Sequence, residues 1–164
     1  MQKEIVFAGG CFWGVEKFMG LSIQVRKTEV GFANGSYESP KYEEVYRGDT
    51  GFAEVVLVKY TGELNELLRH FYKIIDPTAK NRQAGDIGSH YRTGVYFLDP
   101  ADEVIIAKSL AELQKEYDKP IVVENLPLLN YYKAEEMHQK YLDKNPDGYC
   151  HIPDHVYEEA MQEN

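Results

Sequence analysis

The sequence predicts an α+β fold in which helices layer against a sheet in a split βαβ arrangement. Segments of strand and helix character interleave along the chain, yet the strands predicted at 23–33 and 51–60 follow one another with no helix between them. A doubly wound parallel sheet would place a helix at that point. Because 164 residues with a hydrophobic content of 43% suit one core, we expect a single domain over residues 1–164.

The elements follow from local patterns. A β-rich run at 4–9 ends in glycines, and spaced apolar residues at 13–20 indicate a short helix that also ends at a glycine. Turn formers predict loops at 34–50, 76–93 and 145–155, the last ahead of a short acidic end. The remaining expected elements are a helix at 63–75, a strand at 94–99, a helix with a capping start at 101–117, a strand at 120–126 and a helix at 133–144.

The charge and hydropathy of the chain exclude several classes of partner. A formal net charge of −9 would repel nucleic acid and anionic membrane surfaces, and no apolar run approaches the ~20 residues of a membrane span. The apolar run at 5–8 is far short of the roughly 7 to 15 residues of an export signal. We therefore expect a cytoplasmic protein with no nucleic-acid or membrane partner.

Two cysteines, Cys11 and Cys150, lie near opposite ends of the chain. Cys11 is placed where a strand ends and a helix begins, so the positive end of the helix dipole should favour its thiolate. The alternative is a small buried hydrophobic residue, the common fate of a free cysteine. Gly9 and Gly10 favour the reactive cysteine, because they allow another group to approach the backbone closely.

Four blocks of the sequence carry a family resemblance. "GGCFWGVE" at 9–16, "KYEEVYRGDTGFAEVV" at 41–56, "GDIGSHYRT" at 85–93 and "NPDGYCHI" at 145–152 resemble the A-type peptide methionine sulfoxide reductases. The resemblance implies a two-layer sandwich with a split βαβ (ferredoxin-like) core and an irregular C-terminal segment. It also implies reduction of the S epimer of methionine sulfoxide, in proteins or as the free amino acid.

A sulfoxide needs an apolar wall for its methyl group and hydrogen-bond donors for its oxygen. Phe12 and Trp13 can supply the wall, although aromatic pairs more often fill a core. For the oxygen, the resemblance points to Glu54, with Tyr42 and Tyr91 alongside. A carboxyl group among apolar residues has a raised pKa, so Glu54 could stay protonated and act as the acid of the reaction.

Two further positions complete the predicted pocket. Asp86 matches a family position near the pocket, where we expect it to orient groups or hold water. The position two before Glu54 is often histidine in the family and is Phe52 here, so we expect altered pocket edges and retained activity.

Attack by Cys11 on the sulfoxide would leave a sulfenic acid on the cysteine. Cys150, in a flexible loop, could then form a disulfide with Cys11, which an external dithiol such as thioredoxin would reduce by exchange. The alternative is a structural disulfide, which a reducing cytosol disfavours. A monomer suits an enzyme that must reach varied protein surfaces.

Two other classes remain open. A thiol hydrolase could pair Cys11 with a histidine, although we expect the candidates to be surface or helix-face residues: His70, His90, His138 and His155. A metal-binding module could use Cys150, His151 and His155, but a closed zinc site usually needs a fourth ligand. The sequence accordingly predicts no metal site and no cofactor.

Overall fold

The computed structural model describes residues 2–36, 40–47 and 50–163. Within them the main sheet has six strands in the order β7-β6-β1-β3-β2-β8, and a two-stranded hairpin pairs β4 with β5. The strands are β1 (Lys3–Gly9), β2 (Val25–Ala33), β3 (Ala53–Tyr60), β4 (Arg82–Gln83), β5 (Asp86–Ile87), β6 (Thr93–Phe97), β7 (Glu124–Pro127) and β8 (Tyr131–Lys133). The helices are α1 (Phe12–Met19), α2 (Tyr42–Tyr46), α3 (Leu64–Tyr72), α4 (Asp102–Gln114), α5 (Tyr141–Lys144) and α6 (Asp154–Glu163).

The four central strands confirm the split βαβ core. They stand in the order β6-β1-β3-β2, and each pairs with its neighbours antiparallel. Strands β1 and β2, which α1 connects, are therefore parallel to each other, with β3 inserted between them. At the two edges β7 adds parallel to β6 and β8 adds antiparallel to β2.

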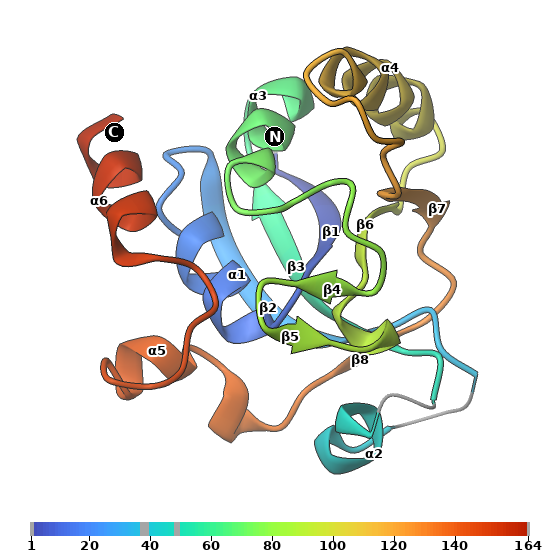
Figure 1. Cartoon of the computed structure of the whole chain (residues 1–164). Helices are drawn as coiled ribbons and strands as arrows, with labels where there is room; N and C mark the ends of the chain where they lie inside the picture. The colour runs from blue at the N-terminus through green and yellow to red at the C-terminus, as the bar shows by residue number, and fades with distance from the viewer. Residues whose placement is uncertain (1, 37–39, 48–49, 164) are drawn as a thin grey trace.

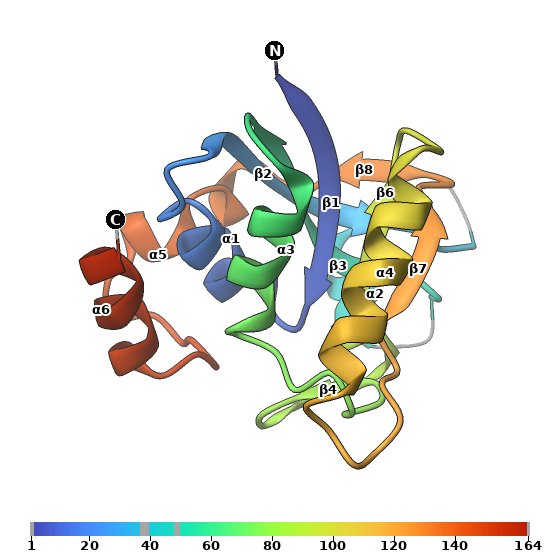
Figure 2. The same ribbon diagram turned by 90° about the horizontal axis from the view of Figure 1, so that it is seen from above.

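The period of two along β1 divides the core between the two faces of the sheet. Ile5 and Phe7 belong to the larger apolar cluster, which also holds side chains of α1, α3 and α4, whereas Val6 and Ala8 belong to a smaller cluster on the other face. The ring of Phe7 lies 4.6 Å from that of Phe71 in α3. Figure 2 shows α1, α3 and α4 packed against the sheet, so the fold has the expected two layers. No helix in the described part of the chain is long and apolar enough to cross a membrane.

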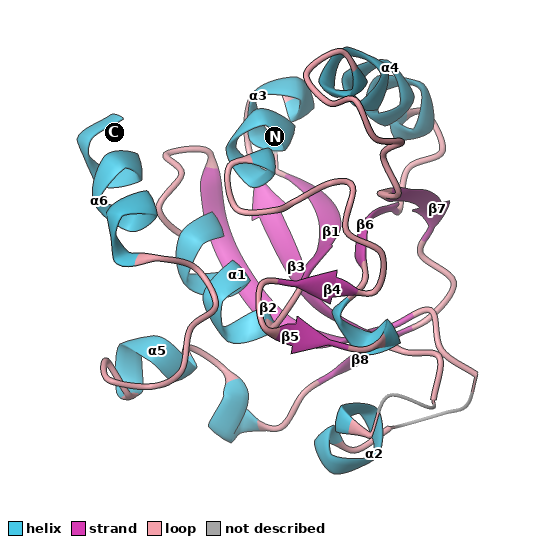
Figure 3. Cartoon of the chain, viewed as in Figure 1, coloured by secondary structure: helices cyan, strands magenta, loops and turns pink. Residues whose placement is uncertain are grey.

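The predicted loops hold more structure than expected. The described part of 34–50 contains α2, and 76–93 contains the β4–β5 hairpin and a 3₁₀ turn at Ser89–Tyr91. The acidic end of the chain forms α6, which Figure 3 shows beyond the loop that leaves α5. Helices of four or five residues give too few periods for a pattern to be recognised.

The helix predicted at 133–144 is wrong, and tertiary hydrogen bonds explain why. The Gln139 side chain accepts from the Val30 N–H at 2.9 Å and donates to the Val30 and Ala134 carbonyls, so it extends the ladder of β2. Lys140 adopts φ +54°, and its N–H donates to the Glu16 carboxyl at 2.7 Å. These bonds outweigh local propensity and leave a 3₁₀ turn at Glu136–His138 and the short α5.

Gln139→Ala should destabilise the fold by about 1–3 kcal/mol, because it leaves the buried Val30 N–H without a partner, while the Val30 carbonyl keeps the Ala134 N–H. Urea unfolding of the variant and of wild type measures the difference. The exposed Gln2→Ala is the control and should stay within about 0.5 kcal/mol of wild type. Equal stability of the Gln139 variant and wild type would contradict this explanation of the broken helix.

Candidate active site

Cys11 occupies the turn between β1 and α1, where it is the N-cap residue. The chain reverses there through Gly10, whose φ of +95° suits glycine. The Cys11 side chain is only 3% exposed and carries a free thiol. The position expected for a nucleophile at a helix N-terminus is thus found, but the thiol is buried as well.

Burial changes the expected ionisation of this thiol. Desolvation, followed by the negative charge of Glu54, raises the pKa of Cys11 far above its ordinary range, and a hydrogen bond from the Trp13 N–H only partly offsets them. The helix N-terminus lowers the pKa of Cys11 as expected, through the Trp13 N–H, but burial outweighs this effect in the substrate-free site. At neutral pH Cys11 carries its proton.

Glu54, in β3, is fully buried. Burial, together with the charge of Asp86, raises the pKa of Glu54 to about 8 against the lowering effect of the Phe12 hydrogen bond. Its Oε1 accepts from the Phe12 N–H at 3.2 Å, whereas Oε2 has no hydrogen-bond partner within the described residues. Near pH 7 the side chain is therefore mostly a neutral carboxylic acid, with one oxygen free to hold and donate a proton.

A cavity of about 650 Å³ opens above Cys11. It is lined by Cys11, Trp13, Tyr42, Tyr46, Gly85, Asp86, Tyr91 and Tyr149. Burial is the main cause of the raised pKa values of Cys11, Tyr42 and Tyr91, and the charge of Glu54 is the second cause in each case. The Glu54 carboxyl therefore lies close to all three side chains. The cavity combines a thiol, an acid and aromatic walls.

The two predicted wall residues lie differently. Trp13 faces the cavity, stacks on Tyr141 at 3.9 Å and donates from Nε1 to His138 Nδ1 at 3.3 Å. Phe12 is fully buried beneath, 5.5 Å from the ring of Phe32. Phe12 contributes to the site through its backbone N–H, and its ring supports the floor.

Asp86 meets the C-terminal segment at the cavity edge. It accepts from the Tyr149 hydroxyl at 2.8 Å, and its other oxygen lies 3.7 Å from His151 Nδ1. His151 Nε2 in turn donates to the Gly9 carbonyl at 3.1 Å. Asp86 thus connects the pocket with the segment that carries Cys150.

Cys150 is half-buried in the loop before α6 and carries a free thiol. Its Sγ lies 3.0 Å from the Tyr157 hydroxyl, which donates to the Gly14 carbonyl. The structure thus brings the second cysteine to the helix that begins at Cys11, although 139 positions separate the two in the sequence.

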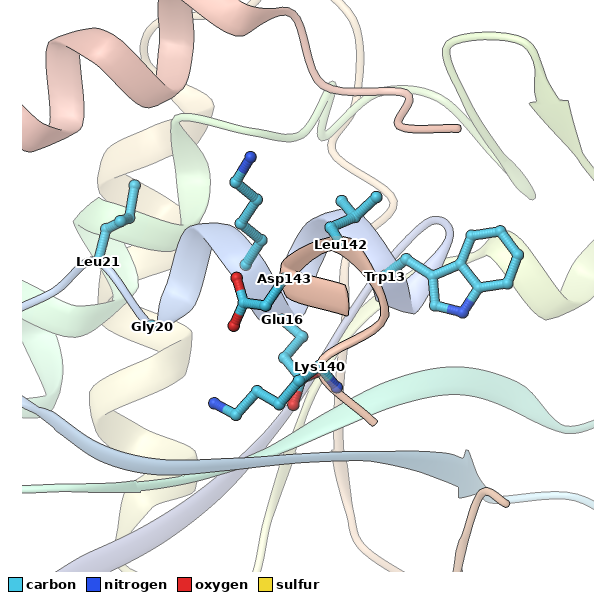
Figure 4. A pocket seen from close by; sticks show the side chains of 8 residues that line it. Trp13, Glu16, Gly20, Leu21, Lys140, Leu142 and Asp143 are labelled. Atoms are coloured by element: carbon cyan, nitrogen blue, oxygen red, sulfur yellow. The ribbon is translucent and has the colours of Figure 1, made fainter. Parts of the chain in front are cut away.

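A smaller cavity of about 200 Å³ lies between α1 and α5 and does not contain Cys11 (Figure 4). The Glu16 carboxyl beside it accepts from Thr28 Oγ1 at 2.9 Å and from the Lys140 N–H, and Lys140 Nζ donates to Thr28 Oγ1 at 2.8 Å. This partly buried network connects α1 to the C-terminal segment. It explains how Trp13 and Tyr141 are held in register.

His70 in α3 and His155 in α6 lie on helices as expected, whereas the other two candidate histidines and Phe52 depart from expectation. His90 and His138 are buried at 4% exposure, not surface residues, and the bond of His138 runs to Trp13. Phe52 is fully buried over Gly35 and packs edge-on against Tyr132, 6.0 Å away, so it is a core residue and not a pocket-edge residue. Within 2–36, 40–47 and 50–163, no three His, Cys, Asp or Glu side chains form a group that could hold a metal ion.

The sequence identified most of the residues that line this cavity but not Tyr46, Gly85 and Tyr149. Tyr149 directly precedes Cys150 in a quoted block, so its neighbour was the available signal. Tyr46, which is 59% exposed on α2, lies in the quoted block at 41–56, but its exposure is typical of an ordinary surface residue.

Two thiols, a neutral carboxylic acid and an aromatic cavity on a two-layer α+β fold define a thiol-dependent oxidoreductase. The protein-family model described as "Peptide methionine sulfoxide reductase" matches residues 3–164, and the chain belongs to this family.

Individual relatives agree with this membership. The "Peptide methionine sulfoxide reductase MsrA" of Clostridium perfringens is 58% identical over 153 residues, which cover 92% of this chain and 98% of that protein. The reduced form of Mxr1 from Saccharomyces cerevisiae superposes with a TM-score of 0.87 at 41% identity, covering 91% of this chain and 88% of that one. Mxr1 in complex with Trx2 matches with a TM-score of 0.61 at 28% identity over 85% and 84% of the two chains.

The raised pKa of Glu54 predicts a pH-dependent stability that Glu54→Gln should remove. Between the ordinary value of 4.5 and about 8, the unfolded carboxyl ionises while the folded one keeps its proton, so stability is full below 4.5 and is lost as pH rises through about 8. Urea unfolding at pH 5 and pH 9 should show wild type losing on the order of a few kcal/mol more than the variant.

The exposed Glu66→Gln serves as the control and should follow wild type at both pH values. Parallel pH curves for wild type and Glu54→Gln would show that Glu54 ionises normally.

Proposed function

We propose that this protein reduces the S epimer of methionine sulfoxide to methionine, in oxidised proteins or as the free amino acid. The observation that carries the proposal is the Cys11 thiol at an aromatic cavity, close to the buried Glu54 carboxyl, whose charge raises the pKa of Cys11. Membership of the peptide methionine sulfoxide reductase family supports the substrate class.

The protons held by Cys11 and Glu54 are sufficient for the reductive step. Glu54 donates its proton to the sulfoxide oxygen while the Cys11 sulfur attacks the sulfoxide sulfur, and the Cys11 proton returns to the Glu54 carboxylate. The oxygen then passes to the Cys11 sulfur, so a thiol and a sulfoxide become a sulfenic acid and a thioether. Sulfur of the cysteine is oxidised, sulfur of methionine is reduced, and no other reactant is required.

The remaining lining residues take positioning roles. Burial raises the pKa values of Tyr42 and Tyr91 well above their ordinary range, so both hydroxyls keep their protons and can donate to the sulfoxide oxygen. Trp13, fixed by its stack on Tyr141, provides the apolar wall for the methyl group, with Phe12 beneath it. Asp86, hydrogen-bonded to Tyr149, orients the pocket edge and holds water there.

Cys150 resolves the intermediate. Its sulfur attacks the Cys11 sulfenic acid, the S–O bond breaks, and the departing hydroxide takes the Cys150 proton to leave as water. Thioredoxin then reduces the Cys11–Cys150 disulfide by exchange. The complex of the related Mxr1 with Trx2 supports this choice of reductant.

The same proposal extends to the setting of the enzyme. Residues 1–164 act as one domain and as a monomer, which leaves the cavity open to varied oxidised proteins. Two free thiols suit a cytoplasmic location, where disulfides are kept reduced.

The direct test is an assay on resolved epimers of a methionine sulfoxide substrate with a dithiol reductant, scored by methionine formed. We expect the S epimer to be consumed and the R epimer to be essentially untouched. With Trp13 fixed against the methyl group and Glu54 fixed at the oxygen, only one configuration at the sulfoxide sulfur fits. Omission of the reductant gives the background. Equal consumption of both epimers would refute the proposal.

Single substitutions should separate the two cysteines. Cys11→Ser should release no methionine, because the attacking sulfur is gone. Cys150→Ser should release about one methionine per enzyme without reductant, leave a sulfenic acid on Cys11 and then stall with thioredoxin, while small thiols rescue it in part. Wild type should release about one methionine and form an internal disulfide.

Methionine release is measured by chromatography and the sulfur states by mass spectrometry. Normal cycling of Cys150→Ser with thioredoxin would remove Cys150 from the mechanism. Melting of wild type on mere reduction would instead favour a structural disulfide.

A further inference from the structure

Tyr157, in α6, stands between the second cysteine and the helix of the first. Its side chain is 5% exposed, and its hydroxyl lies 3.0 Å from the Gly14 carbonyl oxygen and 3.0 Å from Cys150 Sγ. In Figure 1 the loop from α5 to α6 runs past α1, which brings these segments together.

The donors and acceptors fix the direction of each bond. A carbonyl oxygen only accepts, so the Tyr157 hydroxyl donates to Gly14 and accepts from the Cys150 thiol. Once Cys150 loses its proton, the same hydroxyl is in place to donate to the thiolate. Burial and the hydrogen bond to Cys150 raise the pKa of Tyr157 well above its ordinary range, so the hydroxyl keeps its proton.

The ring of Tyr157 is itself held in place by α1. It packs edge-on against Phe18 at 6.0 Å, and Lys17 Nζ lies 4.7 Å above its face. The position of the hydroxyl is therefore set by the helix that Cys11 begins.

The glycine at position 14 makes room for the second cysteine. A Cβ at Gly14 would lie 3.0 Å from Cys150 Sγ and 3.2 Å from Ile152 Cδ1, tighter than ordinary contact. A parallel contact lies on the other side of Cys11, where His151 Nε2 donates to the Gly9 carbonyl. The segment that carries Cys150 and His151 thus contacts the chain on both sides of Cys11, at Gly14 and at Gly9.

We propose that Tyr157 is a positioning residue for Cys150: it holds the thiol against the first turn of α1 and donates a hydrogen bond to the thiolate that attacks Cys11. The inference rests on the proposed function, since the attacked group is the Cys11 sulfenic acid. In that step the Cys150–Cys11 bond forms, the Cys11 S–O bond breaks, and the oxygen leaves as water with the Cys150 proton.

The test compares Tyr157→Phe with Tyr72→Phe, a matched control whose hydroxyl bonds to Ser109 between α3 and α4. Enzyme is mixed with the S epimer without reductant and quenched over time, and methionine and disulfide are measured. Tyr157→Phe should release its first methionine at the wild-type rate, yet form the disulfide about tenfold or more slowly, as expected on losing a hydrogen bond to a charged group. Tyr72→Phe should match wild type in both.

A second readout separates this role from a merely structural one. In a Cys11→Ser background, the rate of Cys150 alkylation is followed against pH with and without Tyr157→Phe. Loss of the donor should move the midpoint of the profile upward by about one pH unit, because the thiolate is less stabilised. A packing defect alone would expose Cys150 to water and speed alkylation at every pH without moving the midpoint upward.

Gly14→Ala provides an independent variant. Alanine favours a helix, so α1 should persist, while the added methyl displaces Cys150 and slows disulfide formation with the Tyr157 hydroxyl still present. Circular dichroism checks that the helix content is retained.

The outcomes distinguish the two levels of the argument. Absence of methionine from wild type would overturn the proposed function, and the alkylation profile, which needs no sulfoxide, would still decide the role of Tyr157. Disulfide formation at the wild-type rate together with an unmoved alkylation midpoint in Tyr157→Phe would overturn the positioning role.

Discussion

The burial of Glu54 is the constraint on which the site depends. A carboxyl removed from water, with a single backbone hydrogen bond from Phe12, keeps a proton that an exposed glutamate would lose. Burial likewise raises the pKa of Cys11, so the pair formed by Cys11 and Glu54 is neutral at rest. A neutral pair needs no counter-ion, which allows the cavity walls to be aromatic. Proton transfer and sulfur attack can then occur together, with charge developing only when substrate is bound.

The central fold was predictable because its signals are local. The run at 4–9 and the strands at 23–33 and 51–60 have β-rich patterns, and the lack of a helix between the last two indicates the antiparallel pair of β2 and β3. The stretch at 133–144 was not predictable in this way. There the Gln139 amide substitutes for a strand partner and the Glu16 carboxyl captures a backbone N–H, two contacts made across more than a hundred residues.

In the candidate site, too, the features set by local sequence could be predicted, and those set by distant segments could not. Cys11 was placed correctly because a glycine-rich strand end before a helical pattern fixes its position in the chain. Its protonation could not be predicted, since the helix end is local but the desolvation comes from distant segments packed over it. Tyr157 was equally hidden, because nothing in the acidic C-terminal sequence indicates that one of its side chains reaches Gly14. Sequence patterns therefore identify reactive atoms more readily than the groups that tune them.

The backbone contacts of the segment from Gly9 to Gly14 explain its amino-acid composition as much as the Cys11 thiol does. Three of its backbone groups bind separate parts of the site: the Gly9 carbonyl accepts from His151, the Phe12 N–H donates to Glu54, and the Gly14 carbonyl accepts from Tyr157. Side chains at the glycines would obstruct that access, as the contacts of Gly14 with Cys150 show. The same six residues that carry the reactive sulfur therefore also bind Glu54 and the segment that contains Cys150. Such a common anchor keeps the donor, the nucleophile and the resolving thiol aligned while each changes its bonding in turn.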